Sequence, residues 1–211
     1  MTRAWRWVGE RALLRAFPDP VPTANAKALA LASRVSEEAF AGVEDLVPGA
    51  RTLLVVLAHG AEPADELIRL LERGVDVPPT TTRSEHEIPV AYGGVDGPDL
   101  ADVAAHAGIS ESEVVRLHQA ASYTVAFIGF SPGFPYLLGM PDALATPRLA
   151  TPRSRIAAGS VGIGGAYTGI YPQATAGGWR LIGRTDASLF DPSGDPPALL
   201  APGAAVRFVA T

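Results

Sequence analysis

Hydrophobic positions in residues 1–80 alternate between runs typical of strands and spacings typical of helices. Residues 12–17 (ALLRAF) and 51–58 (RTLLVVLA) predict strands, because short apolar runs without helical spacing favour extended chain. Residues 23–40 and 63–74 predict helices, and the second of these begins with a proline and ends before a glycine. These elements predict a small open α+β domain over residues 1–80.

The pattern changes after residues 75–89, VDVPPTTTRSEHEIP, which predict a linker. Of the 22 glycines, 17 lie in residues 81–211. Two short helices are predicted, over residues 99–108 and 110–121, and the second begins with a capping box. The remaining apolar segments are short and separated by glycine and proline, so they predict a mostly-β barrel domain over residues 81–211.

Composition excludes several classes of protein. With 47% hydrophobic residues and 18% charged residues, the chain can bury a substantial core. A net charge of −5 argues against a nucleic-acid binder. The N-terminal segment has no secretory signal pattern, and the run LLVVLA is far shorter than the ~20 residues that span a membrane. We therefore expect a cytoplasmic protein that binds neither nucleic acid nor membrane.

Only Lys27 among the 17 basic residues is a lysine, and the other 16 are arginines. Lys27 lies in an alanine-rich helical run, so the chain contains no P-loop, whose lysine follows a glycine and reaches phosphates. It also provides no plausible biotinyl, Schiff-base or Ser–Ser–Lys amidase lysine. The chain has no cysteines, and its four histidines have no metal-ligand spacing, so we expect no bound transition metal.

The segment GFSPG, residues 129–133, matches the G-x-S-x-G pattern of a nucleophilic serine. Pro132 follows the serine and has no N–H for an oxyanion, and no helix follows, so the pattern predicts a tight turn instead. In that turn Gly129 and Gly133 are expected to take unusual backbone angles. The aromatic residues Phe130, Phe134 and Tyr136 form either a pocket wall or a small core.

Residues 143–185 contain no acidic residue and five arginines, in a chain that is acidic overall. Guanidinium groups suit carboxylates and phosphates, so the stretch predicts a site for an anion, with solvation or pairing to the acidic N-terminal half as the alternative. The glycine-rich segment 157–172 between the arginines offers either anion-binding turns or barrel corners and bulges. His118, on the second short helix, is either a proton-transfer group or a buried structural histidine.

Six segments of the chain form a recognisable set when they are taken together in this order. They are IPVAYGGVDGPDL (88–100), the helix with His118, GFSPGFPYL (129–137), PRLATPR (147–153), AGSVGIGGAYTGIYP (158–172) and GGWRLIGRT (177–185). In this combination the chain resembles the family of 5-oxoprolinase B subunits, also known as allophanate hydrolase subunit 1 and including a sporulation-kinase inhibitor. The resemblance extends over essentially the whole chain.

The resemblance implies an α+β N-terminal domain followed by a cyclophilin-like barrel. It implies one component of an ATP-dependent enzyme that opens 5-oxoproline to glutamate and is active only with partners, a cyclophilin-like C-type subunit and an A-type subunit. ATP is then bound on, or shared with, a partner. By this resemblance, His118 maps to a catalytic position. The positions that map to substrate binding are Phe134, Arg148, Arg153, Ser160, Thr168, Tyr171 and Arg184.

The sequence departs from the family pattern at Tyr167, where a glutamine is expected, and in IAAGS (156–160), which replaces VPAGS. We hypothesise that Arg148, Arg153 and Arg184 bind the small anionic substrate. Two alternatives remain at this stage: a non-catalytic regulator that binds a histidine kinase, and a carboxyl-transfer component of a urea-carboxylase-type or allophanate-type system.

Overall fold

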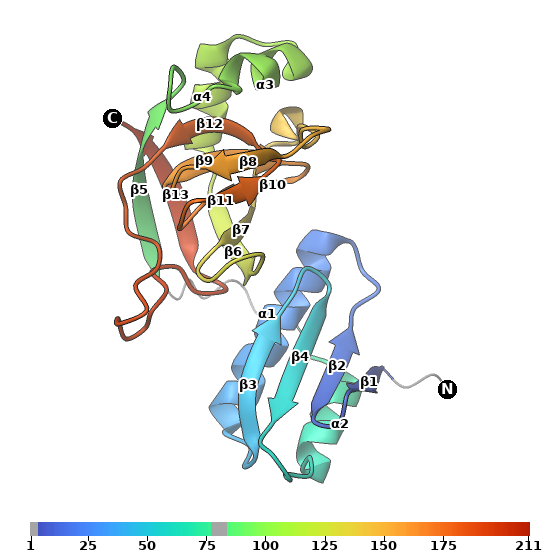
Figure 1. Ribbon diagram of the computed structural model, residues 1–211. Helices are drawn as coiled ribbons and strands as arrows, with labels where there is room; N and C mark the ends of the chain where they lie inside the picture. Colours follow the sequence, from blue (N-terminus) through green and yellow to red (C-terminus); the bar gives the residue numbers. More distant parts are fainter. Residues whose placement is uncertain (1–3, 77–83) are drawn as a thin grey trace. The chain divides into compact units, whose positions relative to one another are not determined.

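The computed structural model describes residues 4–76 and 84–211 and divides the chain into two compact units, residues 1–81 and 82–211 (Figure 1). Each unit has a hydrophobic core of its own. Part of the predicted linker, residues 77–83, lies outside the described residues. Its last five residues belong to a strand that begins at Glu85, because the alternation of buried and exposed positions starts there.

The N-terminal unit is a four-stranded antiparallel sheet with two helices on one side of it (Figure 1). Its elements are β1 (Trp5–Val8), β2 (Ala12–Ala16), α1 (Val21–Glu38), β3 (Val43–Pro48), β4 (Thr52–Leu57) and α2 (Asp65–Arg73). The strands follow the order β1-β2-β4-β3. Leu53, Val55 and Leu57 alternate along β4 and are at most 1% exposed, because they pack in one core with apolar residues of both helices.

The C-terminal unit is a closed barrel of seven strands. Its elements are β5 (Glu85–Tyr92), α3 (Leu100–Ala107), α4 (Glu111–Ala120), β6 (Tyr123–Ile128), β7 (Pro135–Leu138), the 3₁₀ helix η1 (Asp142–Leu144), β8 (Arg153–Ile156), β9 (Ser160–Gly164), β10 (Tyr167–Ile170), β11 (Thr175–Gly177), β12 (Arg180–Arg184) and β13 (Ala205–Ala210). The α+β domain followed by a mostly-β barrel, predicted from the sequence, is confirmed.

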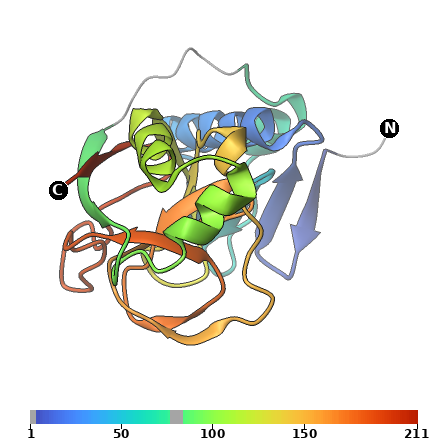
Figure 2. The ribbon, with the colours of Figure 1, turned by 90° about the horizontal axis from the view of Figure 1, so that it is seen from above.

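The barrel strands follow the order β10-β7-β6-β13-β5-β12-β9, and β8 pairs with β11 in a separate ribbon. The barrel is completed by β13, which lies parallel to β5 and antiparallel to β6. The helices α3 and α4 lie at the same end of the barrel in both views (Figures 1 and 2). The predicted cap of α4 is present, since the backbone N–H of Glu113 donates to the Ser110 hydroxyl at 3.2 Å.

The glycines of β9 and β10 allow aromatic rings to lie against the outer side of the sheet. Val161 and Ile163 point into the barrel core, so Gly162 and Gly164 between them face outward. A Cβ atom on Gly164 would lie only 2.5 Å from Cε2 of Trp179. These glycines are therefore needed for close ring packing in mid-strand, rather than at barrel corners.

None of the helices in the described part of the chain is long and apolar enough to cross a membrane.

Candidate functional site

A chain of hydrogen bonds runs through the barrel interior and is centred on His118. The Thr168 hydroxyl donates its one proton to the Gly162 carbonyl at 3.0 Å, so it accepts from Nε2 of His118, also at 3.0 Å. Nδ1 of His118 then accepts from the Tyr92 hydroxyl at 2.8 Å. This direction of donation assigns the tautomer with the proton on Nε2. Both ring nitrogens are thus used within the protein.

The surroundings of His118 keep the imidazole neutral. The residue is fully buried, and its ring centroid lies 4.5 Å from that of Phe208 and 5.3 Å from that of Tyr123. Burial lowers the pKa of His118 from 6.5 to about 3, because the charged form loses its hydration. The Tyr123 hydroxyl donates to the His118 carbonyl at 2.8 Å and ties the end of α4 to β6.

A cluster of aromatic side chains lies on the outer side of the same strands. The Phe134 ring centroid is 5.0 Å from that of Tyr171 and 5.2 Å from that of Trp179, edge to face in both cases. Tyr136 contacts Phe134 and Trp179. Tyr167, the residue that departs from the family pattern, contacts Tyr136 at 5.6 Å. We call these five residues the aromatic cluster; Tyr167 extends it where a glutamine would not.

Two of the predicted arginines lie beside the aromatic cluster. The Arg148 guanidinium lies over the Trp179 ring, 5.8 Å from the centroid. Burial raises the pKa of the Tyr171 hydroxyl, and a hydrogen bond from the Trp179 backbone and the charges of Arg148 and Arg153 oppose that rise. Both arginines therefore act electrostatically on one tyrosine. No carboxylate among the described residues lies within ion-pair distance of Arg148.

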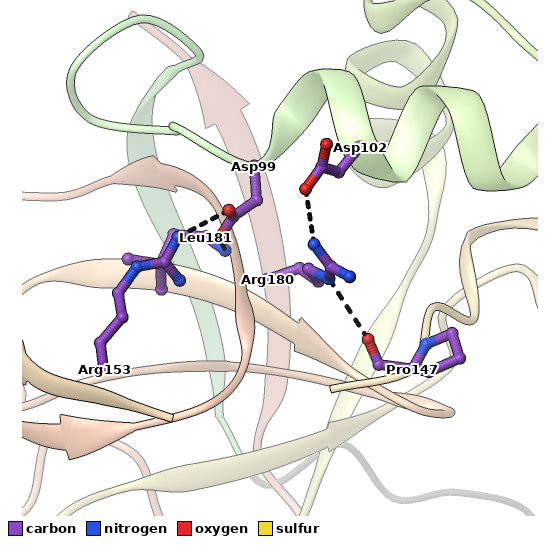
Figure 3. Close-up of polar contacts among 6 residues, drawn as sticks. All are labelled: Asp99, Asp102, Pro147, Arg153, Arg180 and Leu181. Carbon is purple, nitrogen blue, oxygen red and sulfur yellow. Dashed lines mark hydrogen bonds and ion pairs between the residues drawn. The ribbon is translucent and has the colours of Figure 1, made fainter. Parts of the chain in front are cut away.

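Arg153 is fixed from the other side by Asp99, at the start of α3 (Figure 3). Nη2 of Arg153 donates to Asp99 Oδ1 at 2.7 Å, and the backbone N–H of Leu181 donates to Oδ2, also at 2.7 Å. Nη1 of Arg153 is buried and has no hydrogen-bond partner in the described part of the chain. Arg180 pairs with Asp102, one turn further along α3. Arg153 and Arg180 are thus paired with acids of the barrel unit itself, a pairing that the sequence did not predict.

Ser160 lies on β9 beside Tyr171, and Arg184 lies one strand further along the barrel, on β12. Arg184 on β12 is the register partner of Ser160 on β9, and the Tyr171 backbone N–H donates to the Ser160 carbonyl at 2.9 Å. Arg184 is 46% exposed, and its guanidinium nitrogens approach Asp96 and Asp186 only to 4.0 Å. Such loose and exposed ion pairs contribute little stability, so Arg184 is available to another anion.

The GFSPG loop contains an unexpected backbone conformation. The residue with positive φ is Phe130, at 68°, and Gly129 does not have one, so the prediction for Gly129 was wrong. The Ser131 N–H donates to the Gly129 carbonyl at 2.7 Å, which makes a γ-turn centred on Phe130. The hydrogen bond makes Phe130 the central residue of the turn, so the positive φ of a classic γ-turn falls on Phe130 and not on Gly129.

The second half of the loop is a β-turn of the predicted kind. The Phe134 N–H donates to the Ser131 carbonyl at 3.0 Å, with Pro132 and Gly133 at the central positions. Gly133 has φ 76°, as predicted, and a Cβ atom there would lie 2.7 Å from Cβ of Phe190. Ser131 Oγ is buried and has no hydrogen-bond partner among the described residues.

The eight predicted site residues therefore fall on two sides of one sheet. Phe134, Tyr171, Arg148 and Arg153 come together at the aromatic cluster, with Ser160 and Arg184 on adjacent strands. His118 and Thr168 come together inside the barrel. Sequence reasoning missed the partners that fix these groups, Tyr92, Asp99 and Trp179. No spacing links Tyr92 to His118 or Asp99 to Arg153, since the packing of the helices against the strands brings them together.

A cavity of about 700 Å³ lies elsewhere, in the N-terminal unit between α1 and α2. Its lining mixes acidic and basic side chains, such as Glu37, Glu66 and Arg69, and includes none of the predicted site residues. Within residues 4–76 and 84–211 no group of three or more histidines and carboxylates is placed to hold a metal ion.

Comparison with known proteins identifies relatives along nearly the whole chain. A profile of the carboxyltransferase domain, subdomains C and D, matches residues 3–200. The B subunit of 5-oxoprolinase from Escherichia coli O157:H7 is 47% identical over 205 residues, which cover 96% of this chain and 93% of that protein.

Solved structures agree on the fold. The crystal structure of TTHA0988 is 37% identical and superposes with a TM-score of 0.82, covering 96% of this chain and 40% of that one, so this chain spans less than half of that protein. The urea carboxylase of Kluyveromyces lactis has a TM-score of 0.71 over 98% of this chain and 21% of that one. At 20% identity, that likeness concerns the fold alone.

Proposed function

The chain belongs to the family of 5-oxoprolinase B subunits, and from this premise we propose that it is one component of an ATP-dependent enzyme that hydrolyses 5-oxoproline to glutamate. The observation that carries the proposal is the 47% identity over 96% of the chain. The site residues add support, because the aromatic cluster with Arg148 and Arg153 combines apolar surface with positive charge. A small ring that carries a carboxylate needs both.

We assign the binding of that carboxylate to Arg148, Arg153 and Arg184. The Arg148 guanidinium lies over the Trp179 ring and has no carboxylate within ion-pair distance among the described side chains. Nη1 of Arg153 has no hydrogen-bond partner among the described residues, while Nη2 donates to Asp99. Guanidinium groups held in this way are preorganised and lose little freedom when an anion binds.

The other predicted residues are buried, so we assign them supporting and positioning roles. Phe134 and Tyr171 support the ring-binding surface, and Ser160 orients the polar groups beside it. Thr168 and His118 act from inside the barrel: they fix β10 against β9 through the Gly162 carbonyl. We propose a positioning role for His118, because a neutral imidazole with two protein partners is not free to exchange protons with a substrate.

ATP would activate the lactam by transferring its terminal phosphoryl group to the carbonyl oxygen, which leaves ADP. Water then adds to the ring carbon, and the ring C–N bond breaks as the nitrogen takes up a proton. A second water hydrolyses the resulting acyl phosphate to the carboxylate of glutamate and inorganic phosphate. Lys27, the one lysine, ion-pairs with Asp19 at 2.8 Å on the N-terminal unit, so it is not placed as a P-loop lysine. We therefore assign nucleotide binding to a partner or to a shared interface. We expect those partners to be a cyclophilin-like C-type subunit and an A-type subunit, without which this chain is inactive.

Reconstitution tests the proposal directly. The chain is co-expressed with its A-type and C-type partners, and release of glutamate from 5-oxoproline is measured with and without ATP. We expect ATP-dependent release by the complex and none by the isolated chain. A well-formed complex that releases no glutamate would contradict the enzymatic proposal.

A matched pair of arginines tests the anion site. Arg148→Ala should raise the KM for 5-oxoproline by about tenfold, since a charge-assisted contact contributes on the order of 1.5 kcal/mol or more. Arg155, exposed on β8 and outside the proposed site, is the control, and Arg155→Ala should leave KM unchanged. Arg184→Ala should behave like Arg148→Ala, with the complex still assembled. Wild-type kinetics in both site variants would overturn the assignment.

A carboxyl-transfer component is the second candidate, and the matching carboxyltransferase profile is the observation that favours it. The same complex, supplied with ATP, bicarbonate, urea and a biotinylated carrier, distinguishes the two. We expect no carboxylated product, because the identity to 5-oxoprolinase components is much higher than that to urea carboxylase.

A further inference from the structure

Phe130 has a positive φ of 68°, which is an unfavourable backbone conformation for a residue other than glycine. Among the described non-glycine residues only Ala39 and Phe130 have positive φ, and Ala39 is the C-cap of α1, where that conformation is common. Phe130 instead occupies the centre of a γ-turn, a strained arrangement for a bulky side chain. Glycine would remove this strain, and the loop has glycines on both sides of the position.

The Phe130 side chain is also exposed. It is 60% accessible, whereas its neighbours Phe134 and Tyr171 are each 1% accessible. Its ring centroid lies 5.4 Å from that of Phe134 and 6.2 Å from that of Tyr171, edge to face in both cases. The ring thus stands at the open rim of the aromatic cluster. Neither the strained backbone nor the exposed apolar ring of Phe130 stabilises the fold. This combination is typical of functional positions.

The groups around Tyr171 indicate what the Phe130 ring contacts. Tyr171 is next to Phe130, and it is also the tyrosine on which the charges of Arg148 and Arg153 act. An exposed aromatic face and two guanidinium groups therefore converge on one residue. That pairing suits a small ring that stacks on an aromatic surface while its carboxylate meets an arginine.

We infer that Phe130 is a substrate-binding residue, held in a strained turn so that its ring contacts the lactam ring of 5-oxoproline. This inference rests on the proposed function. It adds a residue that is not among the eight predicted site residues. It also gives the GFSPG loop a role that does not involve the buried Ser131 hydroxyl.

Three substitutions separate the ring from the strain, all in the complete complex. Phe130→Ala removes the ring and keeps the strained turn, so the KM for 5-oxoproline should rise about five- to tenfold with the KM for ATP unchanged. Phe130→Gly removes both, so it should show the same rise in KM but melt ~2–4 °C higher than Phe130→Ala. Phe130→Tyr keeps an aromatic ring and should keep the wild-type KM.

A structural role predicts different results. If KM for 5-oxoproline is unchanged in Phe130→Ala, or if that variant loses complex assembly with normal KM in the complex that remains, the inference is overturned. The melting comparison is a second check, since equal melting temperatures for the alanine and glycine variants would remove the argument from strain.

Failure of the proposed function is visible separately, as a wild-type complex without 5-oxoproline turnover. In that case saturation-transfer NMR with 5-oxoproline alone compares the wild-type and Phe130→Ala complexes. Binding that is lost in the variant supports the inference, and binding that is equal in both, or absent from both, overturns it.

Discussion

His118 is enclosed by Tyr92, Thr168, Tyr123 and Phe208, and this enclosure determines its chemistry more than its residue type does. The sequence places it on a helix face with apolar neighbours and leaves open both a proton-transfer role and a structural one. The sequence does not show that the hydroxyl groups of Tyr92 and Thr168 are the partners of His118, because Thr168, for example, is 50 residues away in the chain. Phe130 shows the same limit, since positive φ was expected at a glycine and lies at a phenylalanine.

Stability should depend on pH through His118. Folding lowers the pKa of His118 from 6.5 to about 3. Between these two pH values the imidazole is protonated in the unfolded chain and neutral in the folded one. The contribution of neutral His118 is therefore complete above its unfolded pKa and is lost as the pH falls toward the folded pKa, by up to about 1.4 kcal/mol per pH unit. Urea unfolding of wild type and His118→Gln, from neutral pH to about pH 5, measures this slope.

The glutamine can still accept from Tyr92 and donate to Thr168, but it does not titrate. Its free energy of unfolding should therefore fall less steeply with acid than that of the wild type. His106→Gln, an exposed histidine on α3, is the control and should keep the wild-type slope. Equal slopes for wild type and His118→Gln would contradict the assignment of the buried neutral imidazole.

At the scale of elements, α3 holds the arginine-rich segment in place. The sequence shows that residues 143–185 lack acids, and from this we predicted an anion site. It could not show that Asp99 and Asp102 supply the missing carboxylates, because α3 contacts β12 only in the folded barrel. The two short helices were predictable from caps and apolar spacing, which are local signals. The packing that brings α3 against β12, and Asp99 to Arg153, is not local.

The two carboxylates of α3 should differ in their effect on stability. Asp99 is 6% exposed and accepts two hydrogen bonds, so Asp99→Ala should lower the free energy of unfolding by roughly 2 kcal/mol; the 32% exposure of Arg153 lets water offset part of the loss. Asp102 is 60% exposed, and Asp102→Ala should cost less than about 1 kcal/mol. Chemical denaturation of both variants makes the comparison. Equal losses would show that burial does not separate the two pairs.

At the scale of the whole molecule, the change in glycine content along the chain predicted two domains of different class. The strands β1 and β3 were missed because they lie at the edges of the sheet, where most side chains are exposed and no apolar alternation marks them. The closed barrel was predicted only as a class. Its closure depends on β13 lying parallel to β5, more than 100 residues earlier in the chain, and only the folded structure gives that register.

Separate cores predict separate responses to core mutations. Leu53 belongs to the core of the N-terminal unit and Leu137 to that of the barrel, and both are fully buried. Each change to alanine should lower the local free energy of opening by roughly 2–5 kcal/mol, because it leaves a cavity. Hydrogen exchange with mass spectrometry should then show faster exchange in β2, α1 and β4 for Leu53→Ala, with β6, β9 and β13 unchanged. Leu137→Ala should give the reverse pattern. Faster exchange in both units from either variant would mean that the two cores open as one cooperative unit.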